Sequence, residues 1–513
     1  MTSSIISHIA GSPPAPGNRV CFADLNGTQT LELPDLYARA ERLALQLRRF
    51  GVRSGDRIGI LAANGLEWVL LDLAALRLKA VTAGFEPAKF GPDGALLTRY
   101  GLKLLFTDRP SRAHGVRPVS EVRALVEQAD PPGRLPPVAY GPDDVTTLKF
   151  TSGSTGPPKG LAATVGSIDS SMGAVQQMFG HGPGDSLFVF LPLSLLQQRY
   201  WIYSALRFGH DVIVSTYQAA FSALRRARPT VVMGVPAFYE TAKKHIEARV
   251  RRDGASDPTG AAAALRDEAR RLFGDRIRYL WTGSAPAGAA MLRFFNAVGM
   301  PIYEGYGLNE TCIVSKNYPG ASREGSVGRV LPGKQVLLDA NGVISVRCDY
   351  PVNRRYEYAA PGDSKRVFGD DGVVRTGDVG YLDEDGFLFV RGRADDVIVL
   401  DNGKKIIVRP IEEHLKTSQA IEHCVVFCPG QTHLVAVVSP PSEPADEVAI
   451  AAQLARTNAA FGPDEQVRKV VVAAPRLSIE NDTLTSQFKP RRQRIFENYR
   501  SEIQDNRRGI YAR

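Results

Sequence analysis

The chain has 513 residues, of which 44% are hydrophobic and 23% are charged. These values are ordinary for a globular protein and exclude a disordered, collagen-like or coiled-coil chain. Lysine and arginine outnumber aspartate and glutamate by 63 to 54, and the net charge of +9 favours polyanionic partners without identifying them.

Cysteine usage and apolar stretches bear on the compartment. The five cysteines are too few and too irregularly spaced for a disulfide framework or a paired zinc site, which indicates a reducing compartment. Residues 1–8 lack the basic and apolar regions of a signal peptide. The most apolar stretches, 68–81 and 187–196, are interrupted by charged residues or proline. We therefore expect a cytoplasmic protein without a membrane span.

Helix-like and strand-like segments alternate through the first half of the chain, as in open α/β sheets. Apolar residues from Leu36 to Leu47 recur at helical spacing and stop before Gly51, which predicts a helix. Further helices are expected at 67–78 and 258–273, and strands at 56–61, 147–150, 186–190, 211–215, 230–234, 278–282 and 335–338. These segments predict a large sheet.

The pattern changes in the last third of the chain. Asp-Gly turns at Asp371-Gly372 and Asp385-Gly386 separate short strands. Beyond Ala394, strands are expected at 397–400, 424–428 and 433–438, and helices at 411–417 and after Arg491. The expected fold class is α/β, with a large N-terminal domain of stacked αβ sheets at 1–394 and a small α+β C-terminal domain at 395–513.

The most informative segment is Thr151-Ser-Gly-Ser-Thr-Gly-Pro-Pro-Lys159-Gly160, directly after an expected strand. Its hydroxyl and backbone N–H groups can converge on phosphate oxygens, and Lys159 adds a positive charge. A flexible surface turn would use the same residue types. A Walker P-loop is excluded because Pro158 precedes the lysine and Gly160 follows it.

This segment resembles the phosphate loop of the adenylate-forming superfamily, which includes acyl-CoA synthetases, peptide-synthetase adenylation domains and luciferases. Three more blocks match in the same order: Gly283-Ser-Ala-Pro286, Tyr303-Glu-Gly-Tyr-Gly-Leu-Asn-Glu-Thr311, and Arg375-Thr-Gly-Asp378 continuing to Gly392-Arg-Ala-Asp-Asp396. The resemblance extends from about Asp56 to Lys489 and is strongest to the long-chain fatty acid–CoA ligases. Four ordered motifs are far more specific than one.

The resemblance implies an ATP site. The residues that would hold the phosphates are Thr151, Ser152, Gly153, Ser154, Thr155, Gly156 and Lys159. Adenine would lie between the ring of Tyr306, beside Gly307, and the backbone of Gly283, Ser284 and Ala285. Glu310 would bind Mg²⁺ as a hard oxygen ligand, Asn309 would contact the α-phosphate, and Asp378 and Arg393 would hold the ribose. Taken singly, these residues also suit a core aromatic, a solvated acid or a surface ion pair.

Lys489 matches the family lysine that reaches the reacting carboxylate and the α-phosphate, where negative charge increases in the transition state. With Glu310 it is the expected catalytic residue; the alternative is a solvated basic face shared with Arg491, Arg492 and Arg494. The implied reaction adenylates a small-molecule carboxylic acid and releases pyrophosphate. The small mobile domain then turns about a hinge at Asp395, and a thiol of CoA or of carrier-protein phosphopantetheine passes Gly403 and displaces AMP.

Four positions depart from the family pattern. Asn309 replaces a usual Thr or Ser, Leu195 replaces a usual His, and Lys405 and Val408 replace a usual Asn and Pro. They motivate a second hypothesis, in which adenylation serves an amine acceptor or activates nitrite for N–N bond formation. A third hypothesis is a non-catalytic nucleotide sensor or a nucleic-acid-binding protein. The joint presence of Glu310, Asp378, Arg393 and Lys489 argues against it, so no nucleic acid partner is expected.

Overall fold

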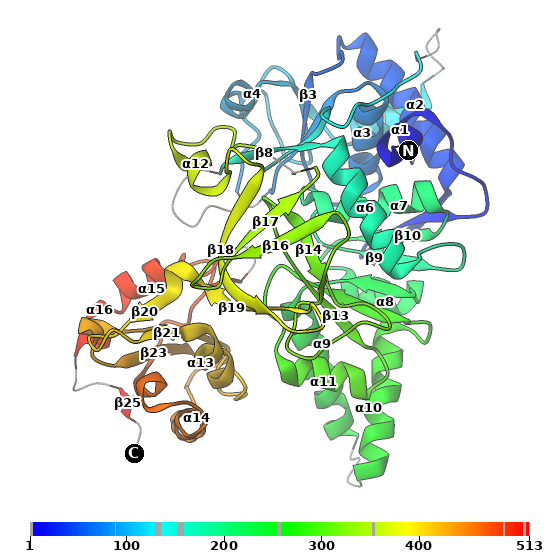
Figure 1. The fold of residues 1–513 in the computed structure, drawn as a ribbon. Helices are drawn as coiled ribbons and strands as arrows, with labels where there is room; N and C mark the ends of the chain where they lie inside the picture. Colours follow the sequence, from blue (N-terminus) through cyan, green and yellow to red (C-terminus); the bar gives the residue numbers. More distant parts are fainter. Residues whose placement is uncertain are drawn as a thin grey trace. The chain divides into compact units, whose positions relative to one another are not determined.

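The computed structural model describes residues 4–87, 89–128, 135–150, 158–253, 258–350, 354–485, 488–505 and 509–511. Among these, the chain forms two compact units (Figure 1). The first contains the described residues up to 150 and those of 158–336 and 346–375; the second contains 337–345 and 376–511. The hinge at Asp395 and the domain limit beside it stay predictions.

The first unit contains a nine-stranded sheet with the order β15-β14-β13-β12-β11-β9-β10-β1-β2. Its strands from β1 to β13 in this order are parallel, and β2, β14 and β15 add antiparallel edges. The bounds are β1 (Arg19–Ala23), β2 (Thr28–Glu32), β9 (Ser186–Val189), β10 (Asp211–Ser215), β11 (Val231–Met233), β12 (Tyr279–Thr282), β13 (Ile302–Leu308), β14 (Cys312–Lys316) and β15 (Arg329–Val330).

A second, six-stranded sheet in this unit has the order β6-β5-β3-β4-β7-β8 and is parallel except for β8. Its strands are β3 (Arg57–Leu61), β4 (Val81–Gly84), β5 (Leu102–Thr107), β6 (Val116–Pro118), β7 (Val145–Phe150) and β8 (Gly160–Thr164). The expected α/β class with stacked sheets in the first unit is confirmed. Strand periodicity did not predict how the strands divide between the sheets, because it shows that strands exist but not which strands pair.

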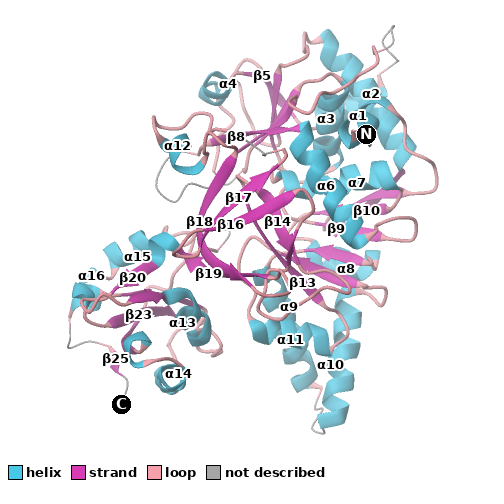
Figure 2. Ribbon diagram, viewed as in Figure 1, coloured by secondary structure: helices cyan, strands magenta, loops and turns pink. Residues whose placement is uncertain are grey.

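Helices cover these sheets in two sets. One set packs with both sheets into the largest core: α1 (Ile5–Gly11), α2 (Leu33–Arg49), α3 (Leu66–Arg77), α5 (Glu121–Glu127), α6 (Val165–Phe179) and α7 (Leu196–Phe208). The other covers the nine-stranded sheet over a separate core: α8 (Ala220–Ala227), α9 (Pro236–Arg252), α10 (Pro258–Phe273) and α11 (Ala289–Ala297). Figure 2 shows α9, α10 and α11 below β13, and α8 to its right. The helix α4 (Gly94–Tyr100) packs beside β5.

Helix α2 shows how the sequence sets these elements. Pro34 lies in its first turn, where no backbone N–H is needed, and Leu36, Leu43 and Leu47 form its buried face. The chain leaves the helix through Gly51, whose φ of 84° suits glycine. The helix expected from Leu36 to Leu47 is confirmed.

A four-stranded sheet, β16-β17-β18-β19, contains the positions where the chain passes from one unit to the other. Its strands are β16 (Lys334–Leu338), β17 (Val343–Cys348), β18 (Val373–Leu382) and β19 (Leu388–Arg393), and α12 (Asp363–Val367) precedes β18. The expected Asp-Gly turns are present, since Gly372 and Gly386 have φ of 76° and 78°. In β18 and β19, Asp378 faces Arg393 across the ladder.

The remainder of the second unit is α+β, as expected. It has the hairpin β20 (Val397–Val399) and β21 (Lys405–Ile407), and the sheet β22 (His423–Phe427), β23 (Leu434–Ser439), β24 (Val467–Val472) and β25 (Ile510–Tyr511). The helical elements are η1 (Ala394–Asp396), α13 (Val408–Leu415), η2 (Pro429–Gln431), α14 (Glu447–Ala460), η3 (Pro463–Glu465), α15 (Arg492–Asn498) and α16 (Arg500–Gln504). Strand β23 is buried throughout because hydrophobic clusters cover both faces of its sheet.

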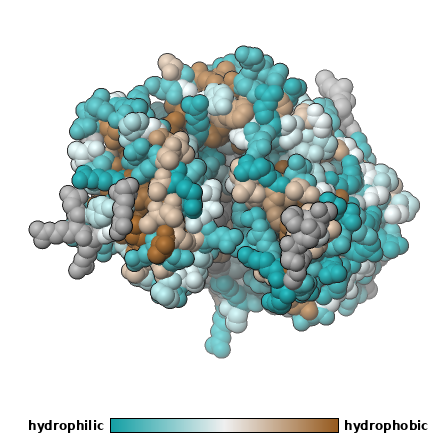
Figure 3. All heavy atoms as spheres, turned by 90° about the horizontal axis from the view of Figure 1, so that it is seen from below, coloured by the Kyte–Doolittle hydropathy of each residue, from teal (hydrophilic) through white to brown (hydrophobic). Residues whose placement is uncertain are grey.

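Hydrophilic residues cover most of the face seen in Figure 3 and interrupt its hydrophobic areas. In the described part of the chain, no helix combines the length and the hydrophobicity that a bilayer crossing requires.

Candidate functional site

Three of the sequence blocks follow the carboxyl ends of parallel strands in the first unit. The phosphate-loop block follows β7, the Gly283 block follows β12, and the Tyr306 block forms the end of β13 and its turn into β14. In open α/β sheets, ligands bind at this edge. The phosphate-loop residues Thr151, Ser152, Gly153, Ser154, Thr155 and Gly156 lie outside the described residues.

Lys159, at the end of the phosphate-loop block, is described. Its Nζ lies 2.9 Å from Oδ2 of Asp363 and 4.9 Å from the ring centroid of Tyr356. This contact lowers the pKa of the Asp363 carboxyl, whose side chain is 17% exposed. Lys159 is thus held by an acid and an aromatic ring from the segment before β18.

Glu310 is hydrogen-bonded to the same tyrosine, Tyr356. The hydroxyl of Tyr356 donates to Oε1 of Glu310 at 2.7 Å, so one side chain contacts both Lys159 and Glu310. Sequence reasoning missed Tyr356 and Asp363, because they lie in a segment rich in Gly, Pro and Asp with no periodic pattern. Their only signal was the position of this segment directly before the Arg375-Thr-Gly-Asp378 block.

Two lysines hold the backbone of the turn that carries Asn309 and Glu310. Lys149, in β7, donates to the carbonyl oxygen of Asn309. Lys334, the first residue of β16, donates to the carbonyl oxygens of Thr311, at 2.7 Å, and Ile313. Burial lowers the pKa of both ammonium groups. Sequence reasoning missed both lysines, although a lysine inside the strand VTTLKF was a signal.

The same cluster contains Cys312, whose Sγ lies 3.2 Å from the hydroxyl of Tyr200. Burial raises the pKa of this thiol, but the ammonium groups of Lys334 and Lys149 and hydrogen bonds from Tyr200 and the Ile313 backbone together lower it, and the net pKa is lowered. Both lysines of the turn therefore also act on the thiol of Cys312.

The expected adenine platform consists of Gly283, Ser284, Ala285, Tyr306 and Gly307. Tyr306 is half-buried, and Ser284 has a left-handed φ of 68°. A Cβ on Gly307 would lie 2.0 Å from the carbonyl oxygen of Cys312, so only glycine fits the bulge between β13 and β14. The N–H of Ala287 donates to Oε1 of Glu304, on β13, at 3.0 Å, which ties the segment after β12 to the neighbouring strand.

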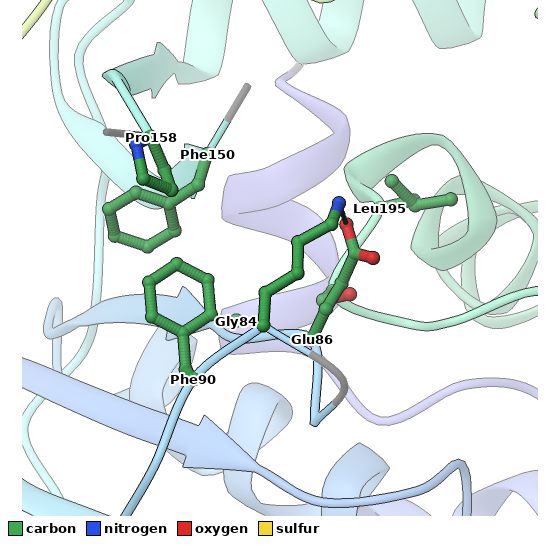
Figure 4. Close-up of a pocket in the computed structure, with 8 residues that line it drawn as sticks. Gly84, Glu86, Phe90, Phe150, Pro158 and Leu195 are labelled. Carbon is green, nitrogen blue, oxygen red and sulfur yellow. Dashed lines mark hydrogen bonds and ion pairs between the residues drawn. The ribbon is translucent and has the colours of Figure 1, made fainter. Parts of the chain in front are cut away.

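A pocket adjoins the end of the phosphate-loop block (Figure 4). The side chains of Phe90, Phe150 and Pro158 form one wall and Leu195 lies opposite, while Glu86 and Lys89 form an ion pair of 2.7 Å. Leu195, which replaces the usual His, therefore makes part of this pocket apolar.

In the second unit, Asp378 and Arg393 are in contact. Arg393 Nη1 lies 3.2 Å from Oδ1 of Asp378 and 2.7 Å from the carbonyl oxygen of Thr376. Gly377 has a φ of 71°, and a Cβ there would lie 2.8 Å from Arg393 Nη2. The glycine of the Thr-Gly-Asp turn thus leaves room for the guanidinium.

Lys489 joins these two residues electrostatically. The side chain keeps contact with solvent, but partial desolvation lowers the pKa of its ammonium; Asp378 opposes this shift and Arg393 adds to it. In the second unit, Lys489 therefore lies within electrostatic range of the Asp378–Arg393 pair.

Asp395 lies beside Arg393, and Gly403 lies in a turn of the same unit. Asp395 is in η1 with an 86% exposed side chain, 3.6 Å from Arg393. Gly403 forms the β20–β21 turn with a φ of 80°, and a Cβ there would meet no atom within 4 Å. Asp464 holds this turn, because it binds Lys404 at 2.7 Å and Asn402 at 3.2 Å.

The basic face considered for the Lys489 segment does not include Arg492. This guanidinium binds Asp396 at 3.1 Å, Glu412 at 2.8 Å and the carbonyl oxygen of Val426 at 2.7 Å. Arg492 thus anchors the segment after Lys489 to η1 and α13.

The donor set fits a metal that arrives with a nucleotide. Among the described residues, no group of three or more His, Cys, Asp and Glu gathers that could hold a metal ion. Glu310 offers one carboxylate, and Mg²⁺ commonly takes one or two carboxylates together with phosphates and water.

Comparisons with known proteins agree with this geometry. The model of the AMP-binding enzyme family matches residues 12–345, and that of the AMP-binding enzyme C-terminal domain matches 395–509. The chain is 27% identical to the long-chain-fatty-acid–CoA ligase FadD15 of Mycobacterium bovis, covering 90% of this chain and 89% of the relative. It is 26% identical to the 2-succinylbenzoate–CoA ligase of Bacillus subtilis, covering 77% and 79%.

Solved structures share the fold. ATP-bound MatB from Rhodopseudomonas palustris superposes with a TM-score of 0.79 at 22% identity, covering 98% of this chain and all of that one. The o-succinylbenzoate CoA synthetase MenE of Bacillus subtilis, with its acyl-adenylate intermediate, gives 0.76 at 21% identity and covers 99% of each chain. The family model spans more than half of this chain, and the chain belongs to the AMP-binding enzyme family.

Proposed function

We propose that this protein is an ATP-dependent, AMP-forming acid–thiol ligase. A carboxylate oxygen attacks the α-phosphorus of ATP and pyrophosphate leaves; a CoA thiol then attacks the acyl carbon and AMP leaves. The observation that carries the proposal is the match of both family models. It is supported by Lys159 and Glu310, which both contact Tyr356, and by the Asp378–Arg393 pair with Lys489 in its electrostatic range.

The first unit would bind the nucleotide by its phosphates and base. Lys159, with the loop at 151–156, neutralises phosphate charge after it exchanges Asp363 for the nucleotide. Glu310 holds Mg²⁺, which reduces the charge on the phosphates. Tyr306 and the Gly283–Ala285 backbone hold adenine, beside Gly307, and Asn309 offers an amide to the α-phosphate.

The second unit would bind the ribose and supply the catalytic lysine. Asp378 accepts from the ribose hydroxyls, and Arg393 donates to the same sugar while it fixes Asp378. Lys489 stabilises the charge that develops on the attacking carboxylate and the α-phosphoryl group. Asp395 serves as the hinge about which the small C-terminal domain turns between the two half-reactions. Gly403 leaves space for the incoming thiol.

The acceptor we propose is CoA, because several relatives are named CoA ligases. These names disfavour an amine acceptor and nitrite activation. A carrier-protein phosphopantetheine is the second candidate thiol. The substrate is a small-molecule carboxylic acid, and the location we propose is the cytoplasm, because the cysteines indicate a reducing compartment.

The test is release of pyrophosphate and AMP over a panel of aliphatic and aromatic acids, with CoA, an acyl carrier protein, an amine or nitrite added in turn. We expect acid-dependent pyrophosphate release, and AMP turnover that rises with CoA. If no acid supports pyrophosphate release, the proposal is wrong. AMP turnover that rises only with an amine would show that the acceptor is an amine instead of CoA. Pyrophosphate release supported only by nitrite would show that the activated oxyanion is nitrite instead of a carboxylate.

A further inference from the structure

We propose that Lys149 and Lys334 are positioning residues that set the turn bearing Glu310, and through it the affinity for Mg²⁺-ATP. The inference rests on the proposed function, in which Glu310 holds the metal. Neither lysine belongs to a sequence block that matched the family, and neither is assigned to the nucleotide.

The contacts are with the backbone of the turn. Lys149 donates to the carbonyl oxygen of Asn309, on one side of Glu310. Lys334 donates to the carbonyl oxygens of Thr311 and Ile313, on the other side. The two ammonium groups therefore hold the residues before and after Glu310, while Tyr356 holds its carboxylate.

Burial gives these contacts their weight. Lys149 is only 6% exposed, and a buried ammonium is costly unless hydrogen bonds compensate for lost water. An apolar side chain of similar length would fill the same space without that cost. The charge therefore has a use at this place, and the groups that it contacts are the carbonyls of the metal-binding turn.

The turn itself needs such support. The β13–β14 pairing shifts register between Tyr306 and Gly307, and Cys312 has a φ of 56°, a region that L residues rarely adopt. Bulges next to active sites re-aim side chains, and they persist when the surroundings over-determine them. Lys149 and Lys334 supply this support through their hydrogen bonds to backbone carbonyl oxygens of the turn.

Lys149 also joins two parts of the nucleotide site. It is the penultimate residue of β7, directly before the segment that enters the phosphate loop, and it bonds to a residue 160 positions later in the chain. A change at Lys149 therefore alters the turn of Glu310 relative to the strand that leads to the phosphate loop.

The experiment compares Lys149→Met, Lys149→Arg and Lys334→Met with a matched control, Lys469→Met. Lys469 is 1% exposed and donates to the carbonyl oxygens of Glu502, Ile503 and Asp505 at the end of α16, so its loss removes a buried, carbonyl-bonded ammonium in the second unit. Calorimetry measures ATP binding without acid at increasing Mg²⁺, and thermal unfolding measures stability.

We expect Lys149→Met and Lys334→Met to weaken Mg²⁺-ATP binding about tenfold, which corresponds to about 1.4 kcal/mol. Lys149→Arg should restore part of the affinity, because it keeps a cationic donor. Lys469→Met should lower the unfolding temperature but keep the wild-type affinity. If one lysine variant fails to fold, the other carries the test.

Affinities within twofold of wild type in both Met variants would overturn this inference and leave the proposed function intact. An equal loss in Lys469→Met would also overturn it, because the effect would then follow from stability alone. If the wild type binds no Mg²⁺-ATP, both the inference and the proposed function fail. If the wild type binds it but no acid is activated, only the proposed reaction fails.

Discussion

The hydroxyl of Tyr356 donates to Oε1 of Glu310 at 2.7 Å, although the two residues lie 46 positions apart. The same ring lies 4.9 Å from the ammonium of Lys159. One aromatic side chain therefore orients the carboxylate proposed for Mg²⁺ and contacts the lysine proposed for the phosphates.

Replacing this tyrosine tests that arrangement. Tyr356→Phe keeps the ring but removes the bond to Glu310, and hydrogen bonds to charged groups contribute about 1.5 to 3 kcal/mol. We expect the Mg²⁺ concentration for half-maximal pyrophosphate release to rise by about tenfold or more. The matched control is Tyr358→Phe, which removes a hydroxyl from the same segment that bonds to Tyr100 at 3.3 Å and to Arg57. An equal rise in the control would contradict the prediction.

Lys489 should act in one half-reaction only. Lys489→Ala removes the charge proposed to stabilise the adenylation transition state, so pyrophosphate release should fall by about 10²-fold or more. Thiolysis of a supplied acyl-adenylate by CoA should stay near the wild-type rate. Arg494→Ala, which removes an exposed cation paired with Glu497 at 3.7 Å, serves as the control. Equal loss of both half-reactions would count against the assigned role.

Gly377 offers a test of the ribose pair. Gly377→Ala places a Cβ 2.8 Å from Arg393 Nη2, and so should displace the guanidinium from Asp378 and raise the KM for ATP several-fold. Gly372→Ala is the control, because its φ of 76° imposes similar backbone strain while its Cβ would meet no atom within 4 Å. Both variants should lose stability, and only Gly377→Ala should change the KM. The same KM in both would show that steric contact with Arg393 is unimportant.

Acid should destabilise the first unit through His181. Burial lowers the pKa of this imidazole to about 3, and the ring is buried against Phe179 of α6, Tyr279 of β12 and His210. Because the folded pKa lies below the unfolded value near 6.5, this contribution to stability is complete above pH 6.5 and is lost as the pH falls toward 3. Between pH 6.5 and 5, the loss should reach about 2 kcal/mol.

Chemical unfolding of the wild type and of His181→Gln at pH 7.5 and 5.0 measures this effect. The wild type should lose more unfolding free energy than the variant over this interval. The lowered pKa of His210 adds a loss that both proteins share. If the two proteins lose the same amount, the imidazole of His181 does not titrate as expected.

Local sequence patterns were sufficient to predict where individual helices and strands lie. The helix expected at 258–273 and the strand expected at 211–215 have those bounds in the structure, because helical and strand periodicities are properties of neighbouring residues. The helix expected at 411–417 begins earlier, at Val408, because proline is tolerated in a first turn and Pro410 lies there. The sheets were less predictable, since the pairing of six and nine strands depends on contacts between distant segments.

The sequence by itself determined the family and the chemical types of the candidate site residues, because the four motifs are contiguous and ordered. Only the tertiary structure decided which side chains hold them. Tyr356 bonds to Glu310, Asp363 to Lys159, and Lys149 to the backbone of Asn309. Lys334 bonds to the backbone of Thr311, 23 positions earlier in the chain. The roles of these residues depend on burial and distance. A lysine in a strand can fix a turn only where folding removes water from its ammonium and leaves backbone carbonyl oxygens as its hydrogen-bond partners.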